Sequence, residues 1–448
     1  MIRASLALAL LAISFVAQAR ASQPPLYGGT ITVALEPGAI SFDPLVSTPA
    51  SAELSSLIYD TPFRLDAHGV VQPHIALSLE TSTDGLHATL KIRTGVHFHD
   101  GTALTALDVA ASLRHALSSP AGWLLAPIKQ IASDGEKVEI DLFRPTPELS
   151  SLLSARVAAV LPRGEVSLVK GLPIGSGPFV CQSSSARSIV LSHNALYFAG
   201  RPFVNGIVLQ RFAGAADEAN AFDAGMLLAG HEQRTKLGHQ NKNGKTLSAV
   251  ASGEQNLAEV VVIGAKIPSD IAVNLRRVID LAVNREALRK TSVREPATAF
   301  MSAKYDPAAA RAIIASAPAL QRSFELWVDA SRPGDREVGE RLVGDLSRVG
   351  LMVRMTVVDP QTYETRAADL SLGLVLPAVP EGSVAALALL AEIDPSSARE
   401  KWKHGKAADD SRAIVLFHRA ARLFYRPSLR GLRFSTLGLP EWSDVHLR

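Results

Sequence analysis

The sequence predicts an α/β protein with two or three domains. Residues 324–331 (FELWVDAS) have the pattern of a strand, residues 335–350 that of a helix with one apolar face, and residues 351–359 that of a second strand. Two strands joined by a helix form a parallel pair with a right-handed crossover. The chain has 448 residues, of which 47% are hydrophobic. This is enough for separate cores at about 150 residues per domain.

The N-terminal segment, residues 1–21, has the features of a secretory signal peptide. Arg3 precedes an apolar stretch from Leu6 to Val16, and small residues favour cleavage after Ala21 or, as the alternative, after Ala19. The stretch is too short to cross a membrane, which takes about 20 apolar residues. We therefore expect an exported, soluble protein.

Further elements follow from the spacing of apolar residues. In chain order, we expect a strand at 28–36, a helix around Leu54, Leu57 and Ile58, a half-buried strand pair at 88–98 broken at Gly95, a helix that begins with Thr105 and Asp108 as a capping box, loops at 224–255, and a helix at 270–290 with an apolar stripe of Ile271, Leu275, Val278, Ile279 and Ala282.

The composition gives little support for a polyanionic partner. The chain has 46 Lys and Arg residues against 43 Asp and Glu, and the net charge falls to +1 once Arg3 and Arg20 are removed with the signal peptide. The one cysteine, Cys181, cannot form an intrachain disulfide, so stability depends on a large core. Five C-terminal arginines flank apolar residues, so we interpret them as a solvated face and expect no nucleic-acid partner. They are Arg419, Arg422, Arg426, Arg430 and Arg433.

Two histidines, His97 and His99, raise the question of a metal site. Residues two apart in a strand share one face, so both imidazoles would lie beside Asp100. A zinc site needs three or four ligands, and the other ten histidines offer no second ligand pair. The alternative is a strand that turns into the capped helix at Thr105, with nothing bound.

The sequence contains near matches to catalytic motifs but no complete one. IGSGPF (174–179) lacks the spacing of a nucleophile elbow, HEQRT has Thr235 where a zinc helix needs a second histidine, and NKNGKT has His239 where a phosphate loop needs glycine. No nucleophile and base pair stands out, so a hydrolase is the weakest interpretation. We expect no enzyme activity and no cofactor.

Several stretches, taken together, resemble a known family. They are, in chain order, YGGTITVALEPGAISFDPL, VVQPHIALSLETSTDGLHATLKIRTGVHFHDGTALTALDVAASLRHAL, PIGSGPFVCQ, IVLSHNALYFAGRPFVNGIVLQRF, NLRRVIDLAVNREAL and YDPAAARAII. This set is similar to the peptide/nickel family of extracellular solute-binding proteins (family 5), the receptors that deliver ligands to ABC importers. In that family, the segment matching GVHFHDG joins a strand to a helix away from the ligand. The resemblance therefore favours the structural turn over the metal site.

The resemblance implies an α/β, two-lobe type II periplasmic-binding-protein-like fold with an extra inserted subdomain in lobe I. Lobe I would hold residues 22–264 and return at 413–448, and the subdomain would be inserted at about 49–170. Lobe II would hold residues 265–412. The ligand would lie in a cleft between the lobes and be enclosed by hinge closure.

The same resemblance implies the ligand contacts. Peptide-binding members carry a Trp-x-x-Asp-like segment in lobe II, whereas the aligned stretch here has no acid between Asp369 and Glu381. A buried ammonium without its carboxylate would cost several kcal/mol. We therefore expect a ligand that is neutral or apolar at that end, unless Asp369 or Glu381 takes the role. The expected contacts are Thr48, Pro49, Ala50 and Ser51 in lobe I, then Gly264, and Gly373, Leu374, Val375, Leu376 and Pro377 in lobe II.

The sequence thus predicts a periplasmic, monomeric receptor that passes a small-molecule or peptide ligand to an inner-membrane ABC permease. An ordinary oligopeptide receptor is the alternative within this class. The alternative from another class is a divergent member that has lost ligand uptake and acts as an interaction or scaffolding protein.

Overall fold

The computed structural model describes most of the chain. The described residues are 26–36, 38–46, 48–66, 68–231, 248–252, 257–264, 267–292, 297–299, 305–317, 322–330, 334–359, 362–363, 372–375, 395–406, 412–419, 421–435 and 439–448. The predicted signal peptide lies outside these ranges. Within them, no helix combines the length and the apolar character needed to cross a membrane.

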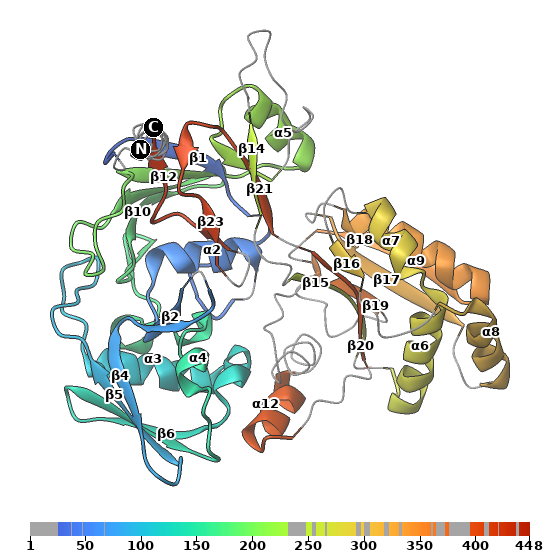
Figure 1. Cartoon of the computed structure of the whole chain (residues 1–448), viewed down its shortest axis with the longest axis horizontal. Coiled ribbons are helices and arrows are strands. Elements are labelled where there is room, and N and C mark those ends of the chain that lie inside the picture. The colour runs from blue at the N-terminus through green and yellow to red at the C-terminus, as the bar shows by residue number, and fades with distance from the viewer. Residues whose placement is uncertain are drawn as a thin grey trace, which may run out of the picture.

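The first body is built on a seven-stranded sheet of order β10-β11-β12-β1-β13-β21-β14 (Figure 1). Its strands are β1 (Thr30–Ala34), β10 (Phe179–Ser184), β11 (Ser188–His193), β12 (Gly206–Gln210), β13 (Ala229–Gly230), β14 (Ala249–Ser252) and β21 (Arg422–Tyr425). β1 is parallel to both β12 and β13. Its apolar residues Ile31 and Val33 are buried in one core with Leu54 and Ile58 of helix α2 (Pro49–Ile58). Helix α5 (Ala215–Asp223) contributes Phe222 to a second cluster.

The inserted subdomain has its own sheet and its own core. The sheet order is β4-β5-β7-β6, formed by β4 (Ala76–Thr81), β5 (His87–Ile92), β6 (Ile128–Ser133) and β7 (Lys137–Leu142). Helix α3 (Ala106–Ser118) packs on it, followed by the 3₁₀ helix η1 (Pro120–Leu125). The predicted capping box is confirmed, since the Thr105 N–H donates to Asp108 Oδ2 at 2.8 Å.

Short elements complete the first body and its subdomain. They are β2 (Phe63–Leu65), β3 (Val71–Pro73), α4 (Leu149–Leu152), η2 (Arg156–Ala158), η3 (Pro162–Gly164), β8 (Leu168–Val169), β9 (Leu172–Pro173), β22 (Leu429–Arg430), β23 (Arg433–Phe434), β24 (Pro440–Glu441) and β25 (His446–Leu447). The predicted strand pair at 88–98 is only half correct. Gly95 turns the chain with a φ of 76°, and beyond it the structure has only an isolated bridge between His97 and Ala103.

The second body is a six-stranded sheet of order β16-β20-β15-β19-β17-β18. Its strands are β15 (Leu257–Ile263), β16 (Ala297–Ala299), β17 (Ser323–Asp329), β18 (Met352–Val358), β19 (Leu372–Val375) and β20 (Ala413–Arg419), and its helices are α6 (Ser269–Ala282), α7 (Arg285–Ser292), α8 (Pro307–Ser316) and α9 (Asp335–Val349). Figure 1 shows these helices on the side of the sheet that faces away from the first body. The predicted strand–helix–strand unit is confirmed, since β17 and β18 pair in parallel across α9.

The structure corrects the predicted lobe boundaries. Both β15 and β20 belong to the second sheet, so the chain changes body between Ser252 and Leu257 and again between Arg419 and Arg422, not at 264/265 and 412/413. Helix α2 belongs to the core of the first sheet, so the inserted subdomain begins after this helix and not at residue 49. β15 and β20 are both apolar strands, and apolar character alone does not tell which sheet a strand joins.

Candidate functional site

The carboxyl ends of β1 and β13 lie where the chain leaves the first sheet. β13 runs antiparallel to β21, pairing Ala229 with Tyr425 and Gly230 with Phe424. The chain beyond Gly230 therefore runs towards Arg422, where β21 starts directly after the second crossover. β14 ends at Ser252, which pairs with Arg422, directly before the first crossover. Residues that follow β1 and β13 therefore lie next to both crossovers. Open α/β sheets typically bind ligands outside the carboxyl ends of such strands.

Glu36, two residues after β1, and His231, directly after β13, meet at this edge. His231 Nε2 is 3.0 Å from Glu36 Oε1, and His231 Nδ1 is 3.2 Å from Glu218 Oε1 on α5. Burial alone would lower the pKa of His231, but the two carboxylates outweigh it and raise the pKa well above its ordinary value. The histidine is thus an imidazolium held between two acids, with 19% of the Glu36 side chain exposed.

Glu53 on α2 brings a third carboxylate to the same place. Its Oε2 accepts from the Glu36 N–H at 2.9 Å, and its Oε1 accepts from Trp442 Nε1 at 2.7 Å. Complete burial, together with the neighbouring Glu36, raises the pKa of Glu53 to about 7. We call Glu36, Glu53, Glu218 and His231 the acid–histidine cluster. It gives this edge of the first body a negative character.

In the second body, the matching edge is formed by the carboxyl ends of β17, β18 and β19. β15 begins directly after the first crossover and runs antiparallel to β19, pairing Val260 with Val375 and Ile263 with Leu372. β19 therefore runs back towards the crossovers, and β17 and β18 run with it. Both sheets consequently present carboxyl ends of parallel strands near the crossovers.

The face of the second sheet opposite its helices carries polar and aromatic side chains. Residues Phe324, Leu326 and Val328 of β17 pack into the helix-covered core. Because side chains alternate along a strand, the intervening Glu325 and Trp327, and Asp329 after them, belong to the other face.

These side chains on β17 supply acids and an aromatic surface. Trp327 packs with Tyr363, Val260 and Val262 on that face. Glu325 accepts from Thr356 Oγ1 at 2.6 Å, and this hydrogen bond lowers the pKa of Glu325. Asp329 is buried at the carboxyl end of the strand. The second body therefore carries carboxylates on the strand next to β19, although β19 itself has none.

Of the four ligand contacts predicted in the first body, the structure buries three and exposes one. Thr48 caps α2, accepting from the Ser51 N–H at 3.0 Å, and its hydroxyl donates to the Ala39 carbonyl at 2.6 Å. Thr48, Ala50 and Ser51 are buried, and only Pro49 is exposed. The hydroxyls of Thr48 and Ser51 are thus used inside the protein to hold the turn after β1 against α2.

The predicted contacts of the second body fall in three places. Gly373, Leu374 and Val375 belong to β19, which runs towards the crossovers. Leu376 and Pro377, like Asp369 and Glu381, lie outside the described residues. Gly264 needs a correction, because β15 runs away from the crossovers for seven residues, about 23 Å at 3.3 Å per residue. Gly264 therefore lies at the opposite edge, where its carbonyl accepts from Arg412 Nη1 at 2.7 Å.

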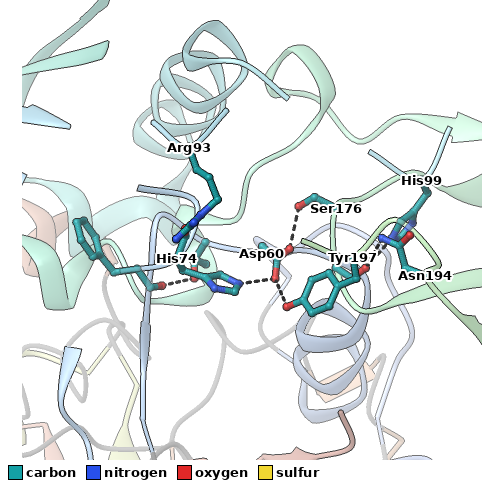
Figure 2. Close-up of polar contacts among 10 residues, drawn as sticks. Asp60, His74, Arg93, His99, Ser176, Asn194 and Tyr197 are labelled. Atoms are coloured by element: carbon teal, nitrogen blue, oxygen red, sulfur yellow. Dashed lines mark hydrogen bonds and ion pairs between the residues drawn. The ribbon is translucent and has the colours of Figure 1, made fainter. Parts of the chain in front are cut away.

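His99, one of the two histidines considered for a metal site, is bonded to the backbone of the segment 175–177. Its Nε2 lies 3.1 Å from the Gly177 carbonyl, and its Nδ1 lies 3.3 Å from the Gly175 N–H (Figure 2). Burial lowers the pKa of His99, in agreement with a neutral ring that donates once and accepts once. Among the described residues, no group of three His, Cys, Asp or Glu side chains is arranged to hold a metal ion.

A buried polar network beside His99 joins the subdomain to the first sheet. Figure 2 shows His74, Ser176 and Tyr197 directed at the carboxylate of Asp60. His74 Nε2 and the Tyr197 hydroxyl lie 2.8 and 3.1 Å from Asp60 Oδ1, and the Ser176 hydroxyl donates to Oδ2 at 3.2 Å. Because Ser176 donates to the aspartate and not to the histidine, the group is not arranged as a nucleophile with its base. We interpret the network as structural.

The most informative residues of the site are ones that the sequence analysis missed. Glu36 stands at the end of the predicted strand 28–36, and Asp329 lies two residues before the end of the predicted strand 324–331, so the sequence already placed an acid near the end of each strand. His231 carried no such signal, because it follows a two-residue strand inside a stretch expected to be loops.

Comparisons with known proteins agree on the architecture. A family model described as bacterial extracellular solute-binding proteins, family 5, middle region, matches residues 70–390. The glutathione-binding protein GsiB of Escherichia coli is 25% identical over 366 residues, covering 73% of this chain and 69% of that protein. The uncharacterized protein YhjP of Bacillus subtilis is 31% identical over 170 residues, covering 37% of this chain and only 28% of that protein.

A solved structure extends the likeness to the whole fold. The oligopeptide-binding protein AppA from Bacillus subtilis, in complex with a nonapeptide, superposes with a TM-score of 0.76 at 18% identity, covering 95% of this chain and 100% of that one. The predicted two-lobe α/β fold is thereby confirmed.

Proposed function

This chain belongs to family 5 of the bacterial extracellular solute-binding proteins, and we propose that it captures a peptide-like ligand between its two bodies for delivery to an inner-membrane ABC permease. The observation that carries the proposal is the arrangement of the two sheets. Each presents carboxyl ends of parallel strands beside the two crossovers, so a ligand held there contacts both bodies and is enclosed when they close.

The acid–histidine cluster and the β17 side chains define what such a ligand meets. Glu36 offers a partly exposed carboxylate from the first body, and Trp327 offers an aromatic face from the second. β19 itself lies between β15 and β17, so its backbone groups are used inside the sheet. The ligand is accordingly a peptide-like molecule whose amino end lies near Glu36. Periplasmic location, a monomeric state and the absence of enzyme activity form part of the same proposal.

This assignment revises one sequence-based expectation. The expectation of a ligand that is neutral at one end rested on the absence of an acid between Asp369 and Glu381 in lobe II. The proposal instead assigns the amino end of the ligand to Glu36 of the first body, whose N–H donates to the carboxylate of Glu53.

Native mass spectrometry of the protein purified from the periplasm tests the proposal. We expect a mass adduct from a co-purified ligand, or from a pool of tryptic peptides added to protein stripped of ligand by unfolding and refolding. A protein that binds nothing from either source, while folded by circular dichroism, would support the alternative of a scaffolding protein.

A further inference from the structure

Helix α12 (Pro395–Lys403) lies between β19 and β20 in sequence, and both of these strands belong to the second sheet. The helix nevertheless packs on the inserted subdomain of the first body, and Figure 1 shows it set apart from the helices of the second sheet. Its Trp402 is 4% exposed and belongs to the subdomain core together with Leu113 and Leu125. A segment of the second body is thus anchored on the first.

The contacts of α12 with the subdomain include hydrogen bonds from its Arg399 to backbone carbonyls. Arg399 donates to the carbonyls of Ser119, at 3.0 Å, and Leu117. These carbonyls lie at the C-terminal end of α3, where helical partners are missing and a cation is favoured. The arginine therefore satisfies groups that would otherwise need water.

Trp402 anchors the other end of the helix. Its Nε1 donates to the Leu124 carbonyl at 2.8 Å, and the Arg144 guanidinium lies 4.3 Å from its ring centroid. Arg144 Nε also donates to the Trp402 carbonyl at 3.3 Å. A buried aromatic ring with a satisfied N–H and a stacked cation is a pattern of tight binding sites.

The two connections of α12 to the second sheet differ greatly in length. Val375 and Pro395 are joined by 19 residues, with a maximal reach of roughly 70 Å, whereas Lys406 and Arg412 are joined by only five, with a maximal reach of about 22 Å. The short connection limits how far the start of β20 can move from the subdomain, and the long connection imposes no such limit.

We propose that α12 is a strap that stays with the first body and sets the widest opening of the two bodies. This proposal depends on the proposed function only because it requires the two bodies to move relative to one another. It requires no bound ligand. The hinge is then bounded on one side by the two crossovers and on the other by the strap, so the open state is a defined conformation.

The first test lengthens each connection in ligand-free protein. Spin labels at Lys137→Cys on the exposed part of β7 and Met352→Cys at the start of β18 report the distance between the bodies, since both side chains are exposed. Cys181 is buried, and burial raises its pKa to about 11, so it stays unlabelled. Ten Gly and Ser residues inserted between Ala408 and Asp409 should shift the distances to longer values. The same insertion between Val384 and Ala385 is the matched control and should change nothing.

The second test fixes α12 to the subdomain. Lys403 Nζ lies 4.5 Å from the Phe143 ring centroid, so Lys403→Cys with Phe143→Cys can be bridged by a short bismaleimide. Bridging should leave the ligand-free radius of gyration in X-ray scattering unchanged, because α12 already moves with the first body. A smaller radius after bridging would show that α12 leaves the subdomain on opening and would overturn the proposal. Equal spin-label distances with and without the insertion after Ala408 would also overturn the proposal, whether or not the protein binds any ligand.

Discussion

His231 Nε2 lies 3.0 Å from Glu36 Oε1, although the two residues are far apart in sequence. The contact exists because β1 and β13 are parallel neighbours, joined through Val33 and Ala229. It fixes a carboxylate at the edge of the first body where both crossovers leave the sheet. This carboxylate is the group that we assign to the amino end of a ligand.

Glu36→Gln should weaken the binding of a peptide with a free amino terminus by tenfold or more, about 1.4 kcal/mol. The reason is that glutamine has nearly the shape of glutamate but lacks the negative charge that would pair with the amino group of the peptide. Calorimetric titration with the co-purified peptide, synthesised with a free and with an acetylated N-terminus, measures the effect. Wild-type protein should prefer the free form, and the variant should not. Glu340→Gln on the exposed face of α9 is the matched control. Equal affinity of the wild type for both forms would remove Glu36 from the site.

The raised pKa of Glu53 makes stability depend on pH. In the folded protein this group binds its proton up to about pH 7, whereas its ordinary value is 4.5. The folded state therefore holds more protons between these values, and the free energy of unfolding falls as pH rises from 4.5 to 7.

Glu53→Gln should flatten this dependence. Between pH 5 and pH 7.5, the free energy of unfolding of the wild type should fall by about 1–3 kcal/mol more than that of the variant. Urea unfolding at both pH values checks this. Parallel losses in the two proteins would mean that Glu53 is ionised across the whole range.

The sequence predicted elements whose signals are local. The β17–α9–β18 unit, with Gly350 ending the helix at a φ of 100°, and the capping box at Thr105 follow from periodicity and from caps within a few residues. The crossovers were misplaced because β15 and β20 are apolar strands that either sheet could take. The acid–histidine cluster was missed because it depends on which strands are neighbours, and β13, with only two residues, has no periodic pattern.

Asp60→Ala should destabilise the protein by about 3 kcal/mol, because His74, Ser176 and Tyr197 would lose a common buried acceptor. Tyr197→Phe removes one of the three hydrogen bonds and should cost about 1 kcal/mol. Urea unfolding measures both. A variant at Asp60 as stable as the wild type would show that the network does not hold the subdomain in place.

His99→Ala should destabilise the protein by about 1–3 kcal/mol, since the Gly175 N–H and the Gly177 carbonyl would lose the ring that contacts both. His97→Ala should cost less, because the isolated bridge of His97 to Ala103 is a backbone contact that alanine keeps. Metal analysis by mass spectrometry should find only background zinc in the wild type. Stoichiometric zinc, lost in the double variant, would restore the metal-site interpretation.

The central claim is that the two bodies close around a ligand, and X-ray scattering of one protein sample tests it most directly. The radius of gyration is measured for protein stripped of its ligand and again after saturation with the ligand found by native mass spectrometry. We predict a smaller radius in the saturated sample, because closure about the crossovers at 253–256 and 420–421 brings the two sheets together. An unchanged radius at saturation would contradict the account.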